Sequence, residues 1–109
     1  MISIDDFSRV DLKVGRIISV SLIPDAKFST HKLEVDFGSE IGIKKSCARL
    51  INYSLDELKN KLVVGVTNLE PRQIGKNISE VLVIGVPDDK GECLLLDVNN
   101  YVKLGARVY

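Results

Sequence analysis

Positively charged side chains gather in three stretches of this sequence, at residues 27–32, 44–49 and 72–76. Acidic residues are absent from 41–55 and from 71–79, although the 109-residue chain carries fifteen basic and fifteen acidic residues. The candidates for phosphate contacts are Lys27, Lys32, Lys44, Lys45, Arg49, Arg72 and Lys76. Because the net charge is zero, any attraction for nucleic acid must come from a local cationic patch and not from a basic protein as a whole.

Arg72 and Lys76 belong to TNLEPRQIGKN, residues 67–77, a polar segment between the apolar runs KLVVGV and ISEVLVIGV. Amide and hydroxyl side chains accompany the two cations and suit phosphate and sugar oxygens: Asn68, Gln73, Asn77 and Ser79. A solvated turn, in which Pro71 and Gly75 shape the backbone, explains the same composition. The position of this segment in the fold must therefore decide between the two interpretations.

Phe28 stands directly after Lys27 and close to His31 and Lys32. An aromatic ring among cations is typical of sites where an unpaired base stacks beside a bound phosphate. A ring that packs its own loop onto the protein explains Phe28 equally well. With only three Phe and three Tyr in the chain, recognition of RNA would depend on shape and phosphates more than on a platform of stacked bases.

Catalytic and metal-binding interpretations find little support. Cys47 and Cys93 are the only cysteines and His31 is the only histidine, so neither a disulfide framework nor a zinc site is indicated. Cys47 is more typical of a small packed thiol than of a nucleophile, because no general base is evident. Glu34 and Asp36, two residues apart, have a spacing that glycosidase carboxylates can show, but a solvated strand face explains them better.

Nucleotide-binding motifs are absent as well. A phosphate-binding loop that ends at Gly75 and Lys76 would need Gly at position 70 and Ser or Thr at position 77, where Glu70 and Asn77 stand. We therefore expect no enzyme activity, no metal ion and no cofactor.

The elements that must position these residues follow from the apolar pattern. Alternation predicts strands over 12–22 and 31–38, with Leu33, Val35 and Phe37 facing inward in the second, and the start of another at residue 41. Apolar runs in both phases predict further strands over 61–66, 79–86 and 92–98. The pair Gly15–Arg16 predicts a bulge in the first strand, and one face of that strand would carry Leu12, Val14, Ile18, Val20 and Leu22. Short helices are predicted at SIDDF, capped by Ser3, and at YSLDELKN, where Ser54 and Glu57 form a capping box.

This order of elements predicts an all-β protein with the OB-fold, a five-stranded Greek-key barrel with short helices and terminal extensions, in one domain over residues 1–109. An OB-fold binds oligonucleotides on strands 2 and 3 and on the loops after strands 1 and 4. Those loops correspond to IPDAKFSTHK and TNLEPRQIGKN, and the third strand carries IKKSCAR. All three cationic stretches are thus expected on the binding surface, although an ordinary charged strand face explains Lys44, Lys45 and Arg49 equally well when they are taken alone.

Five segments carry a resemblance to a known family: VDLKVGRIISV, PDAK, HKLEVDFG, YSLDEL and TNLEPRQIGKNISEVLVIG. They resemble the tRNA-binding OB domain that is appended to methionyl- and tyrosyl-tRNA synthetases and occurs in the endothelial-monocyte-activating polypeptide. The chain is similar in particular to the stand-alone bacterial and archaeal CsaA form. The resemblance implies that Asn68, Arg72 and Ser79 lie at a tRNA-binding surface. The sequence Ser79-Glu80-Val81-Leu82 departs from the Ser-Glu-Gly-Met of the tRNA-binding members.

The resemblance also implies two classes of partner. One is tRNA or another structured RNA, held by a non-catalytic homodimer; the other is an unfolded polypeptide or preprotein, held by an export-related chaperone. Apolar residues near both ends are consistent with docking on a second subunit: Ile2, Ile4, Phe7, Leu104, Val108 and Tyr109. The acidic N-terminus and the short apolar runs indicate a cytoplasmic protein that does not insert into membranes.

Overall fold

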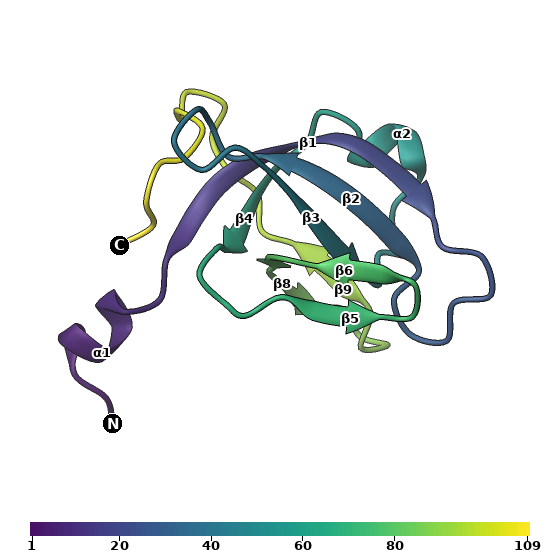
Figure 1. The fold of residues 1–109 in the computed structure, drawn as a ribbon, viewed down its shortest axis with the longest axis horizontal. Coiled ribbons are helices and arrows are strands. Elements are labelled where there is room, and N and C mark those ends of the chain that lie inside the picture. Colours follow the sequence, from purple (N-terminus) through teal and green to yellow (C-terminus); the bar gives the residue numbers. More distant parts are fainter.

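The structure, a computed structural model, describes all residues from Met1 to Tyr109 (Figure 1). Its two short helices and nine strands are α1 (Ile4–Ser8), β1 (Leu12–Leu22), β2 (His31–Asp36), β3 (Ile43–Ala48), α2 (Leu55–Leu58), β4 (Leu62–Val66), β5 (Arg72–Ile74), β6 (Asn77–Ser79), β7 (Leu82–Val83), β8 (Gly85–Pro87) and β9 (Cys93–Leu95). Both helices begin with the predicted capping boxes, at Ser3 and at Ser54. Neither helix has the length or the apolarity that crossing a bilayer requires.

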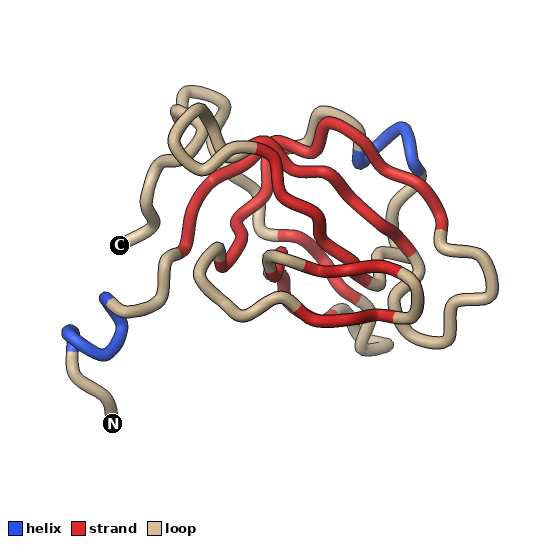
Figure 2. The backbone as a smooth tube through the Cα atoms, in the orientation of Figure 1, coloured by secondary structure: helices blue, strands red, loops and turns tan.

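Five antiparallel strands form one curved sheet in the order β3-β2-β1-β4-β7 (Figures 1 and 2). The sheet nearly closes on itself where Glu80 and Val81, just before β7, donate backbone hydrogen bonds to the carbonyl oxygen of Lys45 in β3, at 2.8 and 3.3 Å. A five-stranded barrel with this order and a helix between β3 and β4 is an OB-fold. The predicted all-β class and architecture are confirmed.

Strand β1 is long and bends, so its two halves pair with different strands. Its first half, Leu12 to Arg16, pairs with β4, and its second half, Arg16 to Leu22, pairs with β2. The register shifts between Ile17 and Ser19, so Ile18 is the extra residue of a bulge. A bulge in this strand is confirmed, but it lies at Ile18 and not at the Gly15–Arg16 pair. The bulge changes the alternation, and Ile17 is the residue that is fully buried.

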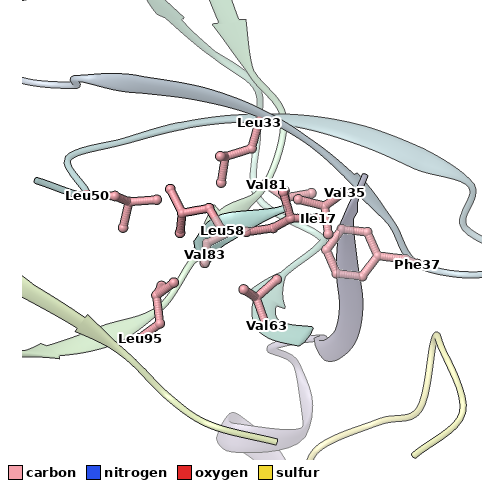
Figure 3. Packing of buried hydrophobic residues seen from close by; sticks show 10 residues of the cluster. All are labelled: Ile17, Leu33, Val35, Phe37, Leu50, Leu58, Val63, Val81, Val83 and Leu95. Carbon is pink, nitrogen blue, oxygen red and sulfur yellow. The ribbon is translucent and has the colours of Figure 1, made fainter. Parts of the chain in front are cut away.

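The barrel interior is a cluster of ten buried apolar side chains (Figure 3): Ile17, Leu33, Val35, Phe37, Leu50, Leu58, Val63, Val81, Val83 and Leu95. The inward positions predicted for Leu33, Val35 and Phe37 are confirmed. Gly15 lets the ring of Phe37 approach β1, because a Cβ atom on Gly15 would lie 2.8 Å from Phe37 Cδ1 and 2.6 Å from Val35 Cγ1.

The segment SEVLVIGV, predicted as one strand, is divided among β6, β7 and β8. The chain turns at Ser79–Val81, where side-chain and backbone groups of these residues form hydrogen bonds with β3. Strands β5 and β6 form a separate hairpin that packs against β3, and β8 pairs with β9 in a second hairpin. The β5–β6 hairpin thereby lies across the edge of the barrel (Figure 1).

Both termini lie on the same side of the barrel, and α1 projects away from it (Figure 1). The C-terminal segment runs beside the start of β1, where Val14 donates to the Ala106 carbonyl at 3.0 Å and Val108 donates to the Leu12 carbonyl at 2.9 Å. Arg107 fixes the adjoining N-terminal segment through an ion pair with Asp11 at 2.6 Å and a hydrogen bond to the Ser8 carbonyl at 2.6 Å.

Candidate nucleic-acid interface

A groove of about 420 Å³ runs over the outer face of β2 and β3 and is bounded on one side by the β5–β6 hairpin. We call it the β2–β3 groove. Its cations are Lys32 from β2, Lys45 from β3 and Lys76 from the hairpin turn. Three separate segments of the sequence therefore bring one lysine each to the same depression.

Strand alternation decides which side chains reach this groove. Glu34 is paired with Lys45, and Lys32 is paired with Cys47, so these four side chains share the outer face. Lys44 is paired with Val35, a fully buried residue, and therefore lies on the opposite face from Lys45. Of the two neighbouring lysines, only Lys45 lines the groove.

A second depression, of about 590 Å³, lies between the loop after β1 and the turn of the β5–β6 hairpin. We call it the loop cavity. Lys27 and Phe28 line it from one side, Ile74 lines it from the other, and Lys76 and Asn77 border both this cavity and the groove. The two depressions thus share a boundary and form one extended surface.

Phe28 is 82% exposed at the loop cavity. Of the two interpretations of this residue, the structure removes one, because a ring that exposed does not pack the loop onto the barrel. Its face remains available to a ligand.

Arg72, on β5, is also exposed, but it lines neither the groove nor the loop cavity. Burial raises the pKa of the Cys47 thiol, while the positive charges of Lys32 and Arg72 lower it and only partly offset that rise. Cys47 is buried and its thiol is held in the protonated form at neutral pH, which agrees with a packed residue and not a nucleophile.

Two predicted site residues are engaged in holding segments of the chain together. The Asn68 amide accepts a hydrogen bond from Asp11 N at 2.9 Å and donates one to the Arg9 carbonyl at 2.7 Å, so it anchors the N-terminal segment. The Arg49 Nε donates to both carboxylate oxygens of Glu92, at 3.2 and 3.0 Å, and joins β3 to the β8–β9 hairpin. Contact of these side chains with RNA stays a prediction.

Ser79 is only 3% exposed. Its hydroxyl accepts from the backbone N–H of Cys47 at 3.0 Å and donates to the Val81 carbonyl at 3.2 Å. Both bonds lie at the seam where the barrel closes. The RNA contact that the family resemblance implies for Ser79 also stays a prediction, and the exposed surface described above does not include this side chain.

His31, considered in the sequence as a neighbour of the phosphate-binding cations, is buried and bonded to the Thr30 hydroxyl at 2.6 Å. Burial lowers the pKa of its imidazole, so the ring is neutral at pH 7 and is not a cation of this surface. The sequence pattern could have predicted that His31 is buried, because His31, Leu33 and Val35 alternate along β2 and share its inward face.

Sequence reasoning missed the contribution of β1. Ser19 and Ser21 line the groove next to Glu34 and Lys32, which are their partners across the β1–β2 ladder. Their outward direction depends on the bulge at Ile18. No group of three or more His, Cys, Asp or Glu side chains in the structure could hold a metal ion.

A barrel of this order, with a groove over β2 and β3 and a cavity between the two adjoining loops, places this chain in the class of OB-fold proteins, which bind oligonucleotides or oligosaccharides on this face. Residues 12–107 match the family model described as "Putative tRNA binding domain", and the chain belongs to this family. The family is a binding family and not a catalytic one.

Sequence relatives include the methionine–tRNA ligases of Thermococcus onnurineus and Pyrococcus abyssi, which are 34% and 36% identical over 112 residues. These alignments cover 98% of this chain but only 14% of each ligase, so the chain corresponds to a small part of those enzymes.

Similar solved structures cover the chain from end to end. The CsaA chaperone protein of Picrophilus torridus is 40% identical with a TM-score of 0.93 and full coverage of both chains. The chaperone CsaA of Bacillus anthracis is 31% identical with a TM-score of 0.91, covering 100% of this chain and 99% of the other. The resemblance to the CsaA form is confirmed.

We expect Ser79→Ala to destabilise the fold by about 1–3 kcal/mol, because it leaves the buried N–H of Cys47 without a partner. Urea denaturation measures this loss. Ser21→Ala, which removes a hydroxyl of the groove that bonds to no other group of the protein, is the matched control. A loss of RNA affinity by Ser79→Ala with unchanged stability would contradict the structural role and support a direct RNA contact.

Proposed function

We propose that this protein is a non-catalytic, homodimeric RNA-binding module of the CsaA type, which holds tRNA or another structured RNA by its phosphates in the cytoplasm. One observation carries the proposal. Four cations from separate segments line the β2–β3 groove and the loop cavity, namely Lys27, Lys32, Lys45 and Lys76. Arg72 lies on the neighbouring strand β5, and none of these five cations takes part in a salt bridge.

The unpaired state of these cations supports a polyanionic ligand. The three salt bridges of the chain involve other basic residues, namely Arg49, Lys61 and Arg107. Each phosphate that a free lysine or arginine neutralises releases condensed counterions, and this release supplies binding free energy without any sequence readout. Shape and spacing of the phosphates would then select a folded RNA, as few aromatic residues are available for stacking.

The homodimer is supported by the N-terminal segment. Helix α1 buries none of its residues against its own chain, and Ile2 and Ile4 are 73% and 76% exposed. Asn68 and Arg107 nevertheless fix the segment that leads to it. A fixed helix with exposed apolar side chains is suited to docking on a second copy of the chain, which would remove these side chains from water.

A second candidate function is an export-related molecular chaperone that binds an unfolded polypeptide or preprotein. The similar structures from Picrophilus torridus and Bacillus anthracis are named chaperones. Within this chain, the loop cavity offers an apolar lining for an extended polypeptide: Ile23, Pro24, Ala26, Phe28 and Ile74. Because this cavity adjoins the cationic groove, RNA and polypeptide would compete for part of the surface.

The RNA function predicts that replacing both Arg72 and Lys76 by Ala weakens binding of a labelled tRNA. The slope of log affinity against log salt should fall by about two, because two phosphate contacts are lost. Fluorescence anisotropy at several salt concentrations measures both quantities. The control replaces Lys59 and Lys90, which are exposed and line neither depression. Equal slopes for the two double variants would refute the proposed site.

The homodimer predicts that Ile4→Asp weakens self-association more than about a hundredfold, since a twofold interface buries the changed side chain twice and each apolar side chain contributes about 1.5–3 kcal/mol. Sedimentation velocity at a range of concentrations follows the change. Asp5→Asn, on the same helix, should leave the dimer intact. A wild-type protein that sediments as a monomer at micromolar concentration would contradict the homodimer.

The chaperone alternative predicts that the wild-type protein suppresses aggregation of a denatured client, that Phe28→Ala removes most of this protection, and that salt has little effect. Light scattering of the diluted client records the protection. Tyr101→Ala alters an aromatic residue that is 98% exposed but does not line the loop cavity, so it should protect like the wild type. Absence of protection by the wild type at stoichiometric amounts would eliminate this alternative.

A further inference from the structure

Glu34 is an acidic side chain that lines the cationic β2–β3 groove. It is exposed, and its carboxylate forms neither a hydrogen bond nor a salt bridge within the chain. Its partners across the sheet are Ser19 on β1 and Lys45 on β3, and Lys32 lies two residues away on the same face. The carboxylate is therefore surrounded by cations and donors but is paired with none of them.

A carboxylate at this point limits what the groove can hold. Two negative charges about 4 Å apart repel by about 1 kcal/mol even in bulk water, and by more where solvent is excluded. A phosphate would avoid the position of Glu34 and would bind to the lysines around it. The part of the ligand that faces Glu34 must instead present hydrogen-bond donors, since an ionised carboxylate only accepts.

Among the parts of an RNA, the base edges supply such donors, and they differ in how well they match a carboxylate. Cytosine and adenine each offer one amino group, and uracil offers one N–H between two carbonyl oxygens that a carboxylate repels. Guanine offers two adjacent donors, N1–H and the N2 amino group, which a carboxylate can accept together. Its O6 lies beside them and is an acceptor suited to a neighbouring ammonium group.

The groove places these complementary groups side by side. Glu34 and Lys45 are directly opposite each other on adjacent strands, where Cβ atoms are about 4.5–5.5 Å apart. Glu34 can accept from N1–H and N2 while Lys45 donates to O6. In a Watson–Crick pair these edge atoms are already bonded to cytosine, so the guanine must be unpaired.

We propose that Glu34 is a specificity residue that selects an unpaired guanine in the bound RNA, with Lys45 as the donor to O6. The proposal rests on the RNA-binding function proposed above and assigns to one residue the base readout that the phosphate contacts do not provide. Lys76 and Asn77 border both the groove and the loop cavity, so the strand that leaves the guanine can reach the exposed face of Phe28.

The test uses the full-length protein and fluorescein-labelled RNA heptamers of uridine that carry G, A, C, U or inosine at the central position. The wild type should bind the G heptamer about 5- to 150-fold more tightly than the A, C and U heptamers, the range expected for a bidentate base contact. Inosine keeps N1–H and O6 but lacks the amino group, so its heptamer should fall between the G and U heptamers.

Glu34→Gln should abolish the preference for guanine and should bind the U heptamer at least as tightly as the wild type, because a negative charge leaves the groove. Glu40→Gln makes the same chemical change at an exposed residue that lines neither the groove nor the loop cavity, and it should keep the preference. Circular dichroism establishes that both variants are folded.

The outcomes separate the two proposals. If the wild type binds tRNA with the expected salt dependence but binds all heptamers with equal affinity, the guanine readout is overturned and the RNA function stands. A guanine preference that survives in Glu34→Gln also overturns it. If neither tRNA nor any heptamer binds, the RNA function itself fails.

Discussion

The closure of the barrel at Ser79–Val81 is the constraint on which the binding surface depends. Only one residue of β3, Lys45, takes part in backbone hydrogen bonds across this seam, where its carbonyl accepts from Glu80 and Val81. Side chains supply the other bonds: the Glu80 carboxylate accepts from Lys45 N at 3.0 Å, and the Ser46 hydroxyl donates to the Val81 carbonyl at 2.9 Å. A buried seam of this kind must satisfy every polar group, and no buried side-chain polar atom is without a partner. Because the seam directly follows the β5–β6 hairpin, it also fixes the wall of the groove.

Features that depend on neighbouring residues, such as strand alternation and helix capping, could be predicted from the sequence. Alternation placed Leu33, Val35 and Phe37 in the core, and two serines followed three residues later by an acid gave both helix starts. The five-stranded order and the position of the loops followed from the succession of elements. The same alternation rule would have separated Lys44 from Lys45 and assigned His31 to the interior, because adjacent residues of a strand face opposite sides.

The features that the sequence did not predict depend on contacts between residues that are distant in the sequence. Ser79 is bound by Cys47, Asn68 by Arg9 and Asp11, and Arg49 by Glu92, and no local signal specifies these pairs. Gly15 indicated a bulge in β1, but the residue that it leaves unpaired depends on which side chain enters the core, and the side chain in the core is that of Ile17. For this reason, the sequence could show that a cationic segment lies near the groove. It could not show which side chains of that segment form bonds within the protein and which face outward.

In the proposed RNA complex, affinity and selectivity would have different structural origins. Lys27 and Lys76 lie on loops, and their long side chains can follow phosphates whose positions vary from one RNA to another. Glu34 lies on β2, which is paired along its whole length with β1 on one side and β3 on the other. A short side chain on a strand held by two ladders has little freedom to adapt, and a hydrogen bond to a base edge requires a fixed direction as well as a distance. The neutral net charge of the chain is compatible with the proposed nucleic-acid ligand, because the proposed phosphate contacts lie in a local patch and a carboxylate within that patch would oppose indiscriminate binding.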